Sequence, residues 1–190
     1  MTTQTQRLTY EEYLKGPEIK QRYSIIDGLM KMAPAPTLDH QRILRNIGMT
    51  MHSFVDSHNI GEVFFVPVDV ILSKGPLLIR QPDFLFVSKE RQGILKDAVE
   101  GAPDLIGEVL SPYDNRASTH GALADYAAIG VRECWFISPQ GSTVEVLTLE
   151  NGEWQRDQLA GTGGTVTSKI LPGFEVEVSG LLPIRQQRDA

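Results

Sequence analysis

The fold is decided by two segments, Arg80-Gln81-Pro82-Asp83-Phe84-Leu85-Phe86-Val87 and Pro103-Asp104-Leu105-Ile106-Gly107-Glu108-Val109-Leu110. Each is a run of apolar, strand-forming residues interrupted by a carboxylate. An ionised carboxylate among apolar neighbours is costly unless a cation or hydrogen-bond donors compensate its charge. Asp83 and Glu108 lie on two predicted strands that can pair side by side. Together they would form a site of hard oxygen ligands, which Mg²⁺ prefers.

The composition is that of an ordinary globular protein, with 41% hydrophobic and 22% charged residues in a chain of 190. This length predicts a single domain over residues 1–190, with flexible ends at 1–7 and 184–190. No apolar stretch is long enough to cross a bilayer, and the polar start lacks the apolar core of a signal peptide. We therefore expect a cytoplasmic protein. Cys134 is the only cysteine and lies in an apolar run, so we expect a buried, inert thiol.

The net charge of -6 argues against a protein that coats nucleic acid non-specifically. It does not exclude an enzyme that grips one phosphodiester locally. The candidate nucleic-acid contacts are Arg42 and Arg45 on one predicted helix and Arg80 beside Asp83. For any single arginine, a solvated surface role is the simpler interpretation.

The first half of the chain predicts helices and strands in alternation. A helix over Leu8–Gly16 starts with a capping box formed by Thr9 and Glu12. Asp27-Gly28 between two short apolar runs predicts a hairpin, because a type I′ turn needs positive φ at both central residues. Asp39 is then expected to cap a helix that continues to about Ser57. The runs at 61–65 and 68–72 predict a pair of strands, followed by the Asp83 strand and a partly helical segment over 88–101.

The second half predicts a parallel crossover, because a strand over 104–110 is followed by a helix over 115–129 and a strand over 131–137. Asn151-Gly152 centres a second hairpin, and the alternating tail at 173–178 is typical of an edge strand. The predicted fold class is α/β (α+β). It is a mixed β-sheet flanked by helices, with N-terminal and C-terminal β-hairpins.

Several short motifs, in this order and spacing, resemble the Uma-type restriction-endonuclease-like family, a branch of the PD-(D/E)xK nuclease superfamily. The resemblance covers roughly residues 8–182, and the motifs that carry it are Tyr23 to Gly28, His40, Gln81-Pro82-Asp83, Ala102 to Pro112, Tyr126, Gly130 to Glu133, Trp135 and Leu171-Pro172-Gly173. It implies a restriction-endonuclease-like fold and hydrolysis of a phosphodiester that depends on Mg²⁺ or Mn²⁺. Asp83 and Glu108 would bind the metal ion.

The sequence departs from the pattern that the resemblance implies. The wider superfamily has a lysine at the position of Leu110, and the Uma-type branch has it at the position of Ala122. No lysine occurs between Lys96 and Lys169. Ser24 stands where the family commonly has a glutamate, and Ser118 stands where an aspartate is usual. These replacements together predict reduced or absent catalysis.

Two further residues have competing interpretations. His40 at a helix start could bind the phosphate or a metal-bound water, since histidine titrates near physiological pH, or it could serve in capping or packing. Tyr126 is most simply a core aromatic residue, although its hydroxyl could orient the site. Asp104 lies at the start of the Glu108 strand, and we interpret it as structural.

Three functions remain open from the sequence. The first is a Mg²⁺-dependent DNA endonuclease, expected by family analogy to be a homodimer. The second is a catalytically inactive relative that binds nucleic acid or a protein partner. The third is a metal-free scaffold whose carboxylates complete internal ion pairs. No Gly-rich phosphate loop is present, so no organic cofactor is expected.

Overall fold

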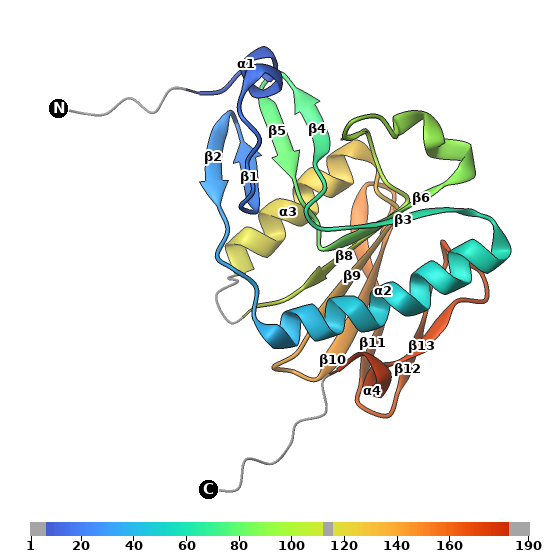
Figure 1. Ribbon diagram of the computed structural model, residues 1–190. Helices are drawn as coiled ribbons and strands as arrows, with labels where there is room; N and C mark the ends of the chain where they lie inside the picture. The colour runs from blue at the N-terminus through green and yellow to red at the C-terminus, as the bar shows by residue number, and fades with distance from the viewer. Residues whose placement is uncertain (1–6, 112–115, 183–190) are drawn as a thin grey trace, which may run out of the picture.

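The described residues form a six-stranded, a five-stranded and a two-stranded β-sheet with helices packed against them, as Figure 1 shows for the computed structural model. The structure describes residues 7–111 and 116–182. The elements in chain order are α1 (Tyr10–Lys15), β1 (Tyr23–Ile26), β2 (Leu29–Met32), α2 (Leu38–His58), β3 (Gly61–Phe65), β4 (Val70–Lys74), β5 (Leu77–Arg80), β6 (Phe84–Ser88), the 3₁₀ helix η1 (Lys89–Ile94), β7 (Val99–Glu100), β8 (Leu105–Val109), α3 (Arg116–Ile129), β9 (Glu133–Ser138), β10 (Thr143–Glu150), β11 (Glu153–Gly161), β12 (Thr165–Thr167), β13 (Glu175–Glu177) and α4 (Val178–Leu181).

The larger sheet has six strands in the order β11-β10-β9-β8-β6-β3. Strands β8 and β9 are parallel and are joined through α3, which confirms the predicted crossover, while the other pairs are antiparallel. The second sheet has the order β2-β1-β5-β4-β7, and β12 pairs with β13. The fold is thus the predicted mixed α+β arrangement flanked by helices, with hairpins near both ends.

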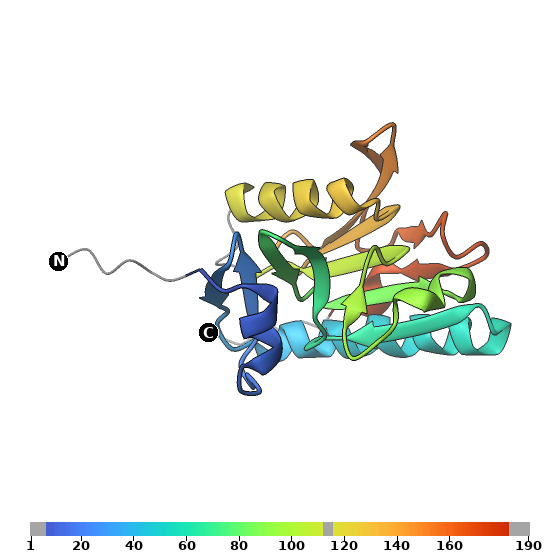
Figure 2. The same cartoon turned by 90° about the horizontal axis from the view of Figure 1, so that it is seen from above.

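Helices α2 and α3 cover opposite faces of the six-stranded sheet, which is plain when the molecule is seen from above (Figure 2). The continuous apolar run of β6 serves both faces, because successive strand side chains point to opposite sides. Phe84 and Phe86 pack into the core beneath α2, whereas Leu85 and Val87 pack into the core that contains Tyr126 of α3. Strand β6 is therefore buried on both faces.

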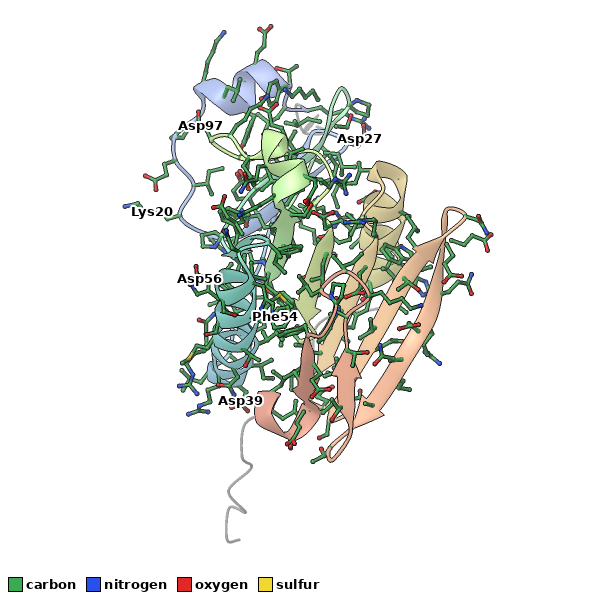
Figure 3. All side chains as sticks on the ribbon, turned by 90° about the vertical axis from the view of Figure 1, so that its right-hand side faces the viewer. Lys20, Asp27, Asp39, Phe54, Asp56 and Asp97 are labelled. Atoms are coloured by element: carbon green, nitrogen blue, oxygen red, sulfur yellow. The ribbon has the colours of Figure 1, made fainter. Side chains whose placement is uncertain are left out.

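The buried face of α2 contains Ile43, Ile47 and Met51, as the helical spacing predicts. Phe54 also points toward the sheet, where its ring meets Phe174 at 5.3 Å between centroids, and Asp56 points away from it (Figure 3). The same spacing predicts that Thr50 is buried, but this residue is exposed.

The sequence predicts Asp39 as the N-cap of α2, and this prediction was wrong. Thr37 is the N-cap, and its hydroxyl accepts a hydrogen bond from the His40 N–H at 3.2 Å. Asp39 lies in the first turn, where its negative charge interacts favourably with the helix dipole. The capping box of Thr9 and Glu12 is confirmed.

The predicted pairing of the strands at 61–65 and 68–72 was also wrong. Strand β3 pairs with β6 in the six-stranded sheet, whereas β4, which runs from Val70 to Lys74, pairs with β5 and β7 in the second sheet. The connection between β3 and β4 passes from one sheet to the other, so adjacency in sequence does not produce a hairpin here.

The two sheets are joined by a polar cluster around Asp69. The hydroxyls of Tyr13 and Tyr23 both donate to Asp69 Oδ2, and Gln81 Nε2 donates to Oδ1 at 2.7 Å. Gln81 also accepts from the Tyr23 N–H at 3.0 Å. Because Gln81 directly follows β5 and precedes the Asp83 segment, this cluster fixes β1 against the start of β6.

Three other expectations concern the chain as a whole. Cys134 is fully buried, and burial together with nearby carboxylates, Glu108 first among them, raises the pKa of its thiol, as an inert thiol requires. The ends predicted to be flexible lie outside the described residues except for Arg7, which pairs with Asp27. None of the described helices has the length and apolar character needed to span a membrane.

Candidate metal centre

The pairing of β6 with β8 brings Asp83 and Glu108 together. The strands are antiparallel with Phe84 opposite Gly107, so continuing this register places Asp83 opposite Glu108. Gly107 is required at its position because the Phe84 ring lies directly over it. An added Cβ would come within 1.9 Å of the ring.

Asp83 is 1% exposed, and each of its oxygens has partners. Oδ2 accepts from the Val109 N–H at 2.6 Å and faces His40 Nε2 at 3.1 Å. Oδ1 accepts from Arg22 Nη1 at 2.5 Å. These donors and the positive charge compensate the desolvation that would otherwise exclude a carboxylate from this position.

Glu108 is held from the α3 side of the sheet. The Tyr126 hydroxyl donates to Oε1 at 3.0 Å, which shows that Tyr126 orients this carboxylate. Burial and the neighbouring Glu108 charge raise the pKa of Tyr126 well above its ordinary value, so the hydroxyl keeps its proton and remains a donor. The other oxygen of Glu108, Oε2, lies 3.3 Å from Arg22 Nη2.

Arg22 therefore bridges the two carboxylates, and sequence reasoning missed it. Its Nη2 also donates to the main-chain carbonyl oxygen of Gln81 at 2.7 Å. Burial disfavours the charged guanidinium, but the carboxylates of Asp83 and Glu108 outweigh this effect and raise the pKa of Arg22. The sequence feature that could have pointed to Arg22 is its position, since it is a basic residue directly before the first strand of an acidic chain.

The donor chemistry at this point suits a divalent metal ion. Three oxygen atoms converge on the guanidinium of Arg22, namely Asp83 Oδ1, Glu108 Oε2 and the Gln81 carbonyl oxygen. Mg²⁺ is commonly held by one or two carboxylates, with water or substrate phosphate completing its ligands. In the described part of the chain no group of three or more His, Cys, Asp or Glu residues could hold a metal ion, and Asp83 and Glu108 are the two carboxylates that contact Arg22.

The sequence matches the family described as "Uma2: Putative restriction endonuclease" over residues 10–180. The chain belongs to the Uma2 family. Membership supports a nuclease-like function. No curated protein matches the sequence.

The Uma2 fold of this chain is shared by a solved structure described as a putative nuclease belonging to DUF820 from Anabaena variabilis ATCC 29413. The two chains superpose with a TM-score of 0.75 at 20% sequence identity, over 92% of this chain and 97% of the other. At this identity the likeness concerns the fold.

The positions where the Uma2 resemblance implies a lysine are apolar. Leu110 and Ala122 are both partly buried and pack against the core cluster that contains Tyr126. Ser24 lies half-buried in β1. Ser118 lies in α3, but its side chain is outside the described residues. Arg22, which lies directly ahead of β1, supplies a cation to both carboxylates.

His40 contacts Asp83 through its ring nitrogen Nε2. It is 7% exposed, and Nδ1 has no hydrogen-bond partner among the described residues. The contact to Asp83 Oδ2 requires a proton on Nε2, because the carboxylate can only accept. His40 therefore orients Asp83 in this Uma2 chain, a role that neither sequence interpretation included.

The three arginines proposed as nucleic-acid contacts have different surroundings. Arg80 donates from Nε to Asp125 of α3 at 2.9 Å and is largely buried. Arg42 and Arg45 lie on the exposed face of α2, whereas His40 belongs to its buried face. The structure therefore does not bring Arg42 and Arg45 to the carboxylates, and their contact with nucleic acid stays a prediction.

Proposed function

We propose that the protein is a Mg²⁺-dependent DNA endonuclease, with Asp83 and Glu108 as metal ligands. The observation that carries the proposal is the convergence of two partly or fully buried carboxylates on one cationic position. Membership of the Uma2 family supports the class of reaction. Mn²⁺ would serve in place of Mg²⁺, since both accept carboxylate oxygens.

The residues around the carboxylates have distinct roles in this proposal. A bound Mg²⁺ supplies an acidified water and neutralises charge on the phosphate. His40 and the Val109 N–H hold Asp83, while Tyr126 holds Glu108, so both ligands are fixed before metal binding. Arg80 lies on the strand that leads into the site, whereas Arg42 and Arg45 lie on the exposed face of α2 and would contact nucleic acid from there.

The first prediction concerns the carboxylates. Asp83→Asn and Glu108→Gln should each lower plasmid cleavage in Mg²⁺ or Mn²⁺ by about 100-fold or more, since a catalytic metal ion contributes several kcal/mol. Cleavage is followed by conversion of supercoiled plasmid to open-circular and linear forms. Asp56→Asn, on the outer side of α2, is the matched control and should cleave like the wild type. Cleavage that persists in both carboxylate variants would refute the proposal.

The second prediction concerns the absent lysine. Ala122→Lys should raise cleavage by about tenfold or more, because an ammonium group beside the carboxylates stabilises charge that develops in the transition state. The half-buried position suits a lysine, whose stem packs along apolar surface while the amine reaches polar groups. Ala124→Lys, on an exposed position of the same helix, is the control. No gain in a folded Ala122→Lys variant would show that the amine is not the limiting defect.

The second candidate function is an inactive nuclease-fold module that binds nucleic acid or a protein. The apolar side chains at Leu110 and Ala122 favour it, because they leave the site without the expected amine. Absence of cleavage by the wild type, together with cleavage by Ala122→Lys, would establish this alternative. We also propose a single domain, a homodimer with paired sites and a cytoplasmic location, all of which rest on the sequence and on family analogy.

A further inference from the structure

The guanidinium of Arg22 lies at the meeting point of the oxygen atoms that would bind a metal ion. We infer that Arg22 and a divalent metal ion compete for these oxygens, so that the ion binds only when Arg22 leaves. This inference rests on the proposed metal-dependent function. It makes Arg22 an internal cation that keeps the site closed until a metal ion replaces it.

The atoms around the guanidinium are ones that a metal ion would also use. Among the described residues, the three hydrogen-bond acceptors of the guanidinium are oxygens of the kind that coordinate Mg²⁺, two from carboxylates and one from a main-chain carbonyl. The other oxygens of the two carboxylates are already engaged by Val109, His40 and Tyr126. The oxygens that face Arg22 are therefore the ones through which a second cation would bind.

The charge of the carboxylates also favours competition between the two cations. Asp83 is 1% exposed, so its carboxylate needs a compensating cation whether or not metal is present. A guanidinium and a divalent ion at the same oxygens would place like charges in contact in a site of reduced dielectric. Binding of either Arg22 or the metal ion, but not of both, compensates the charge of Asp83 and avoids this repulsion.

The side chain of Arg22 has a path outward. Its side chain is 27% exposed, unlike the carboxylate of Asp83. The residue directly precedes β1, and its carbonyl oxygen accepts from the Ala33 N–H at 2.8 Å. The main chain can therefore stay in place while the long side chain rotates into solvent, where it is available to a phosphate.

The inference is tested by measuring metal affinity directly. Mn²⁺ is titrated calorimetrically into the wild type and into Arg22→Met, which keeps the apolar stem and removes the charge. Arg22→Met should bind Mn²⁺ about 10- to 100-fold more tightly, the usual size of a coupling between two linked binding events. Arg22→Lys keeps a cation that cannot bridge both carboxylates. The Mn²⁺ affinity of this variant should therefore lie between those of the wild type and Arg22→Met.

Arg156→Met is the matched control. Arg156 pairs with Glu145 at 2.5 Å on the β10–β11 hairpin, so the variant removes the same charge from an exposed ion pair. It should bind Mn²⁺ like the wild type. Thermal unfolding gives a second readout. Without metal, Arg22→Met should melt at a lower temperature than the wild type, and Mn²⁺ should raise its melting temperature by the larger amount.

Equal affinity in the wild type, Arg22→Met and Arg156→Met would overturn the inference, as would absence of Mn²⁺ binding in all of them. If Arg22→Met does not fold, Arg22→Lys decides the question, since it must still bind more tightly than the wild type. Cleavage without a gain in affinity refutes the competition and leaves the nuclease proposal intact. If the Mn²⁺ affinity rises in Arg22→Met but neither the wild type nor any variant cleaves DNA, the competition is supported and the nuclease proposal is refuted.

Discussion

Gly107→Ala should destabilise the protein by about 3 kcal/mol, because the new methyl group overlaps a buried aromatic ring. The Cβ would lie 1.9–2.4 Å from three atoms of the Phe84 ring, and Phe84 is 1% exposed. The ring cannot rotate out of a core that is packed beneath α2, so β6 and β8 must separate. Urea denaturation followed by tryptophan fluorescence measures the loss of stability.

The same substitution should also weaken Mn²⁺ binding, since the pairing of these strands aligns Asp83 with Glu108. Gly93→Ala is the control, because an added Cβ there meets nothing within 4 Å. Combining Gly107→Ala with Phe84→Leu should cost less than the sum of the two single changes, as expected for residues in contact. Full additivity would contradict the steric explanation.

Glu133→Ala should destabilise the protein by about 3–5 kcal/mol, because each buried donor that loses its acceptor costs roughly 1–3 kcal/mol. Glu133 is fully buried. Its carboxylate accepts hydrogen bonds from Trp135 Nε1 at 2.7 Å and Ser168 Oγ at 2.6 Å, and from the main-chain N–H groups of Lys169 and Ile170. This carboxylate thus fastens the segment that leads into β13 to the six-stranded sheet.

Glu133→Gln should give an intermediate loss, since its amide oxygen still accepts while its NH₂ group opposes the surrounding donors. Glu153→Ala, at an exposed position of β11, should change stability by less than about 0.5 kcal/mol. Amide hydrogen exchange at Lys169 and Ile170 should accelerate in Glu133→Ala. Unchanged protection of these two amides would contradict the fastening role.

Local sequence patterns were sufficient for most elements of the fold. Hydrophobic runs, the Asn-Gly and Asp-Gly turns and the order of elements from 104 to 137 predicted the hairpins and the crossover that the structure contains. The predicted pairing of β3 with β4 failed because a hydrophobic pattern predicts where strands occur. It does not predict the sheet to which each strand belongs. The choice between Thr37 and Asp39 as helix cap failed because both residue types are good caps.

The site was predictable only in part, for a physical reason. Asp83 and Glu108 are conspicuous because each interrupts an apolar run. Their partners are not, since the Val109 N–H belongs to the main chain and Arg22 lies 61 residues before Asp83. The number of cations that could approach a carboxylate is large in any sequence, and only the packed sheets select one.

The contacts of Arg22 also bear on how the chain folds. They span 61 residues to Asp83 and 86 residues to Glu108, and contacts of such separation require the intervening loop to close before they yield stabilisation. A growing polypeptide released only as far as β6 has one acidic partner for this arginine and lacks the other. The candidate site is therefore complete only after β6 and β8 have paired, and it forms late in folding.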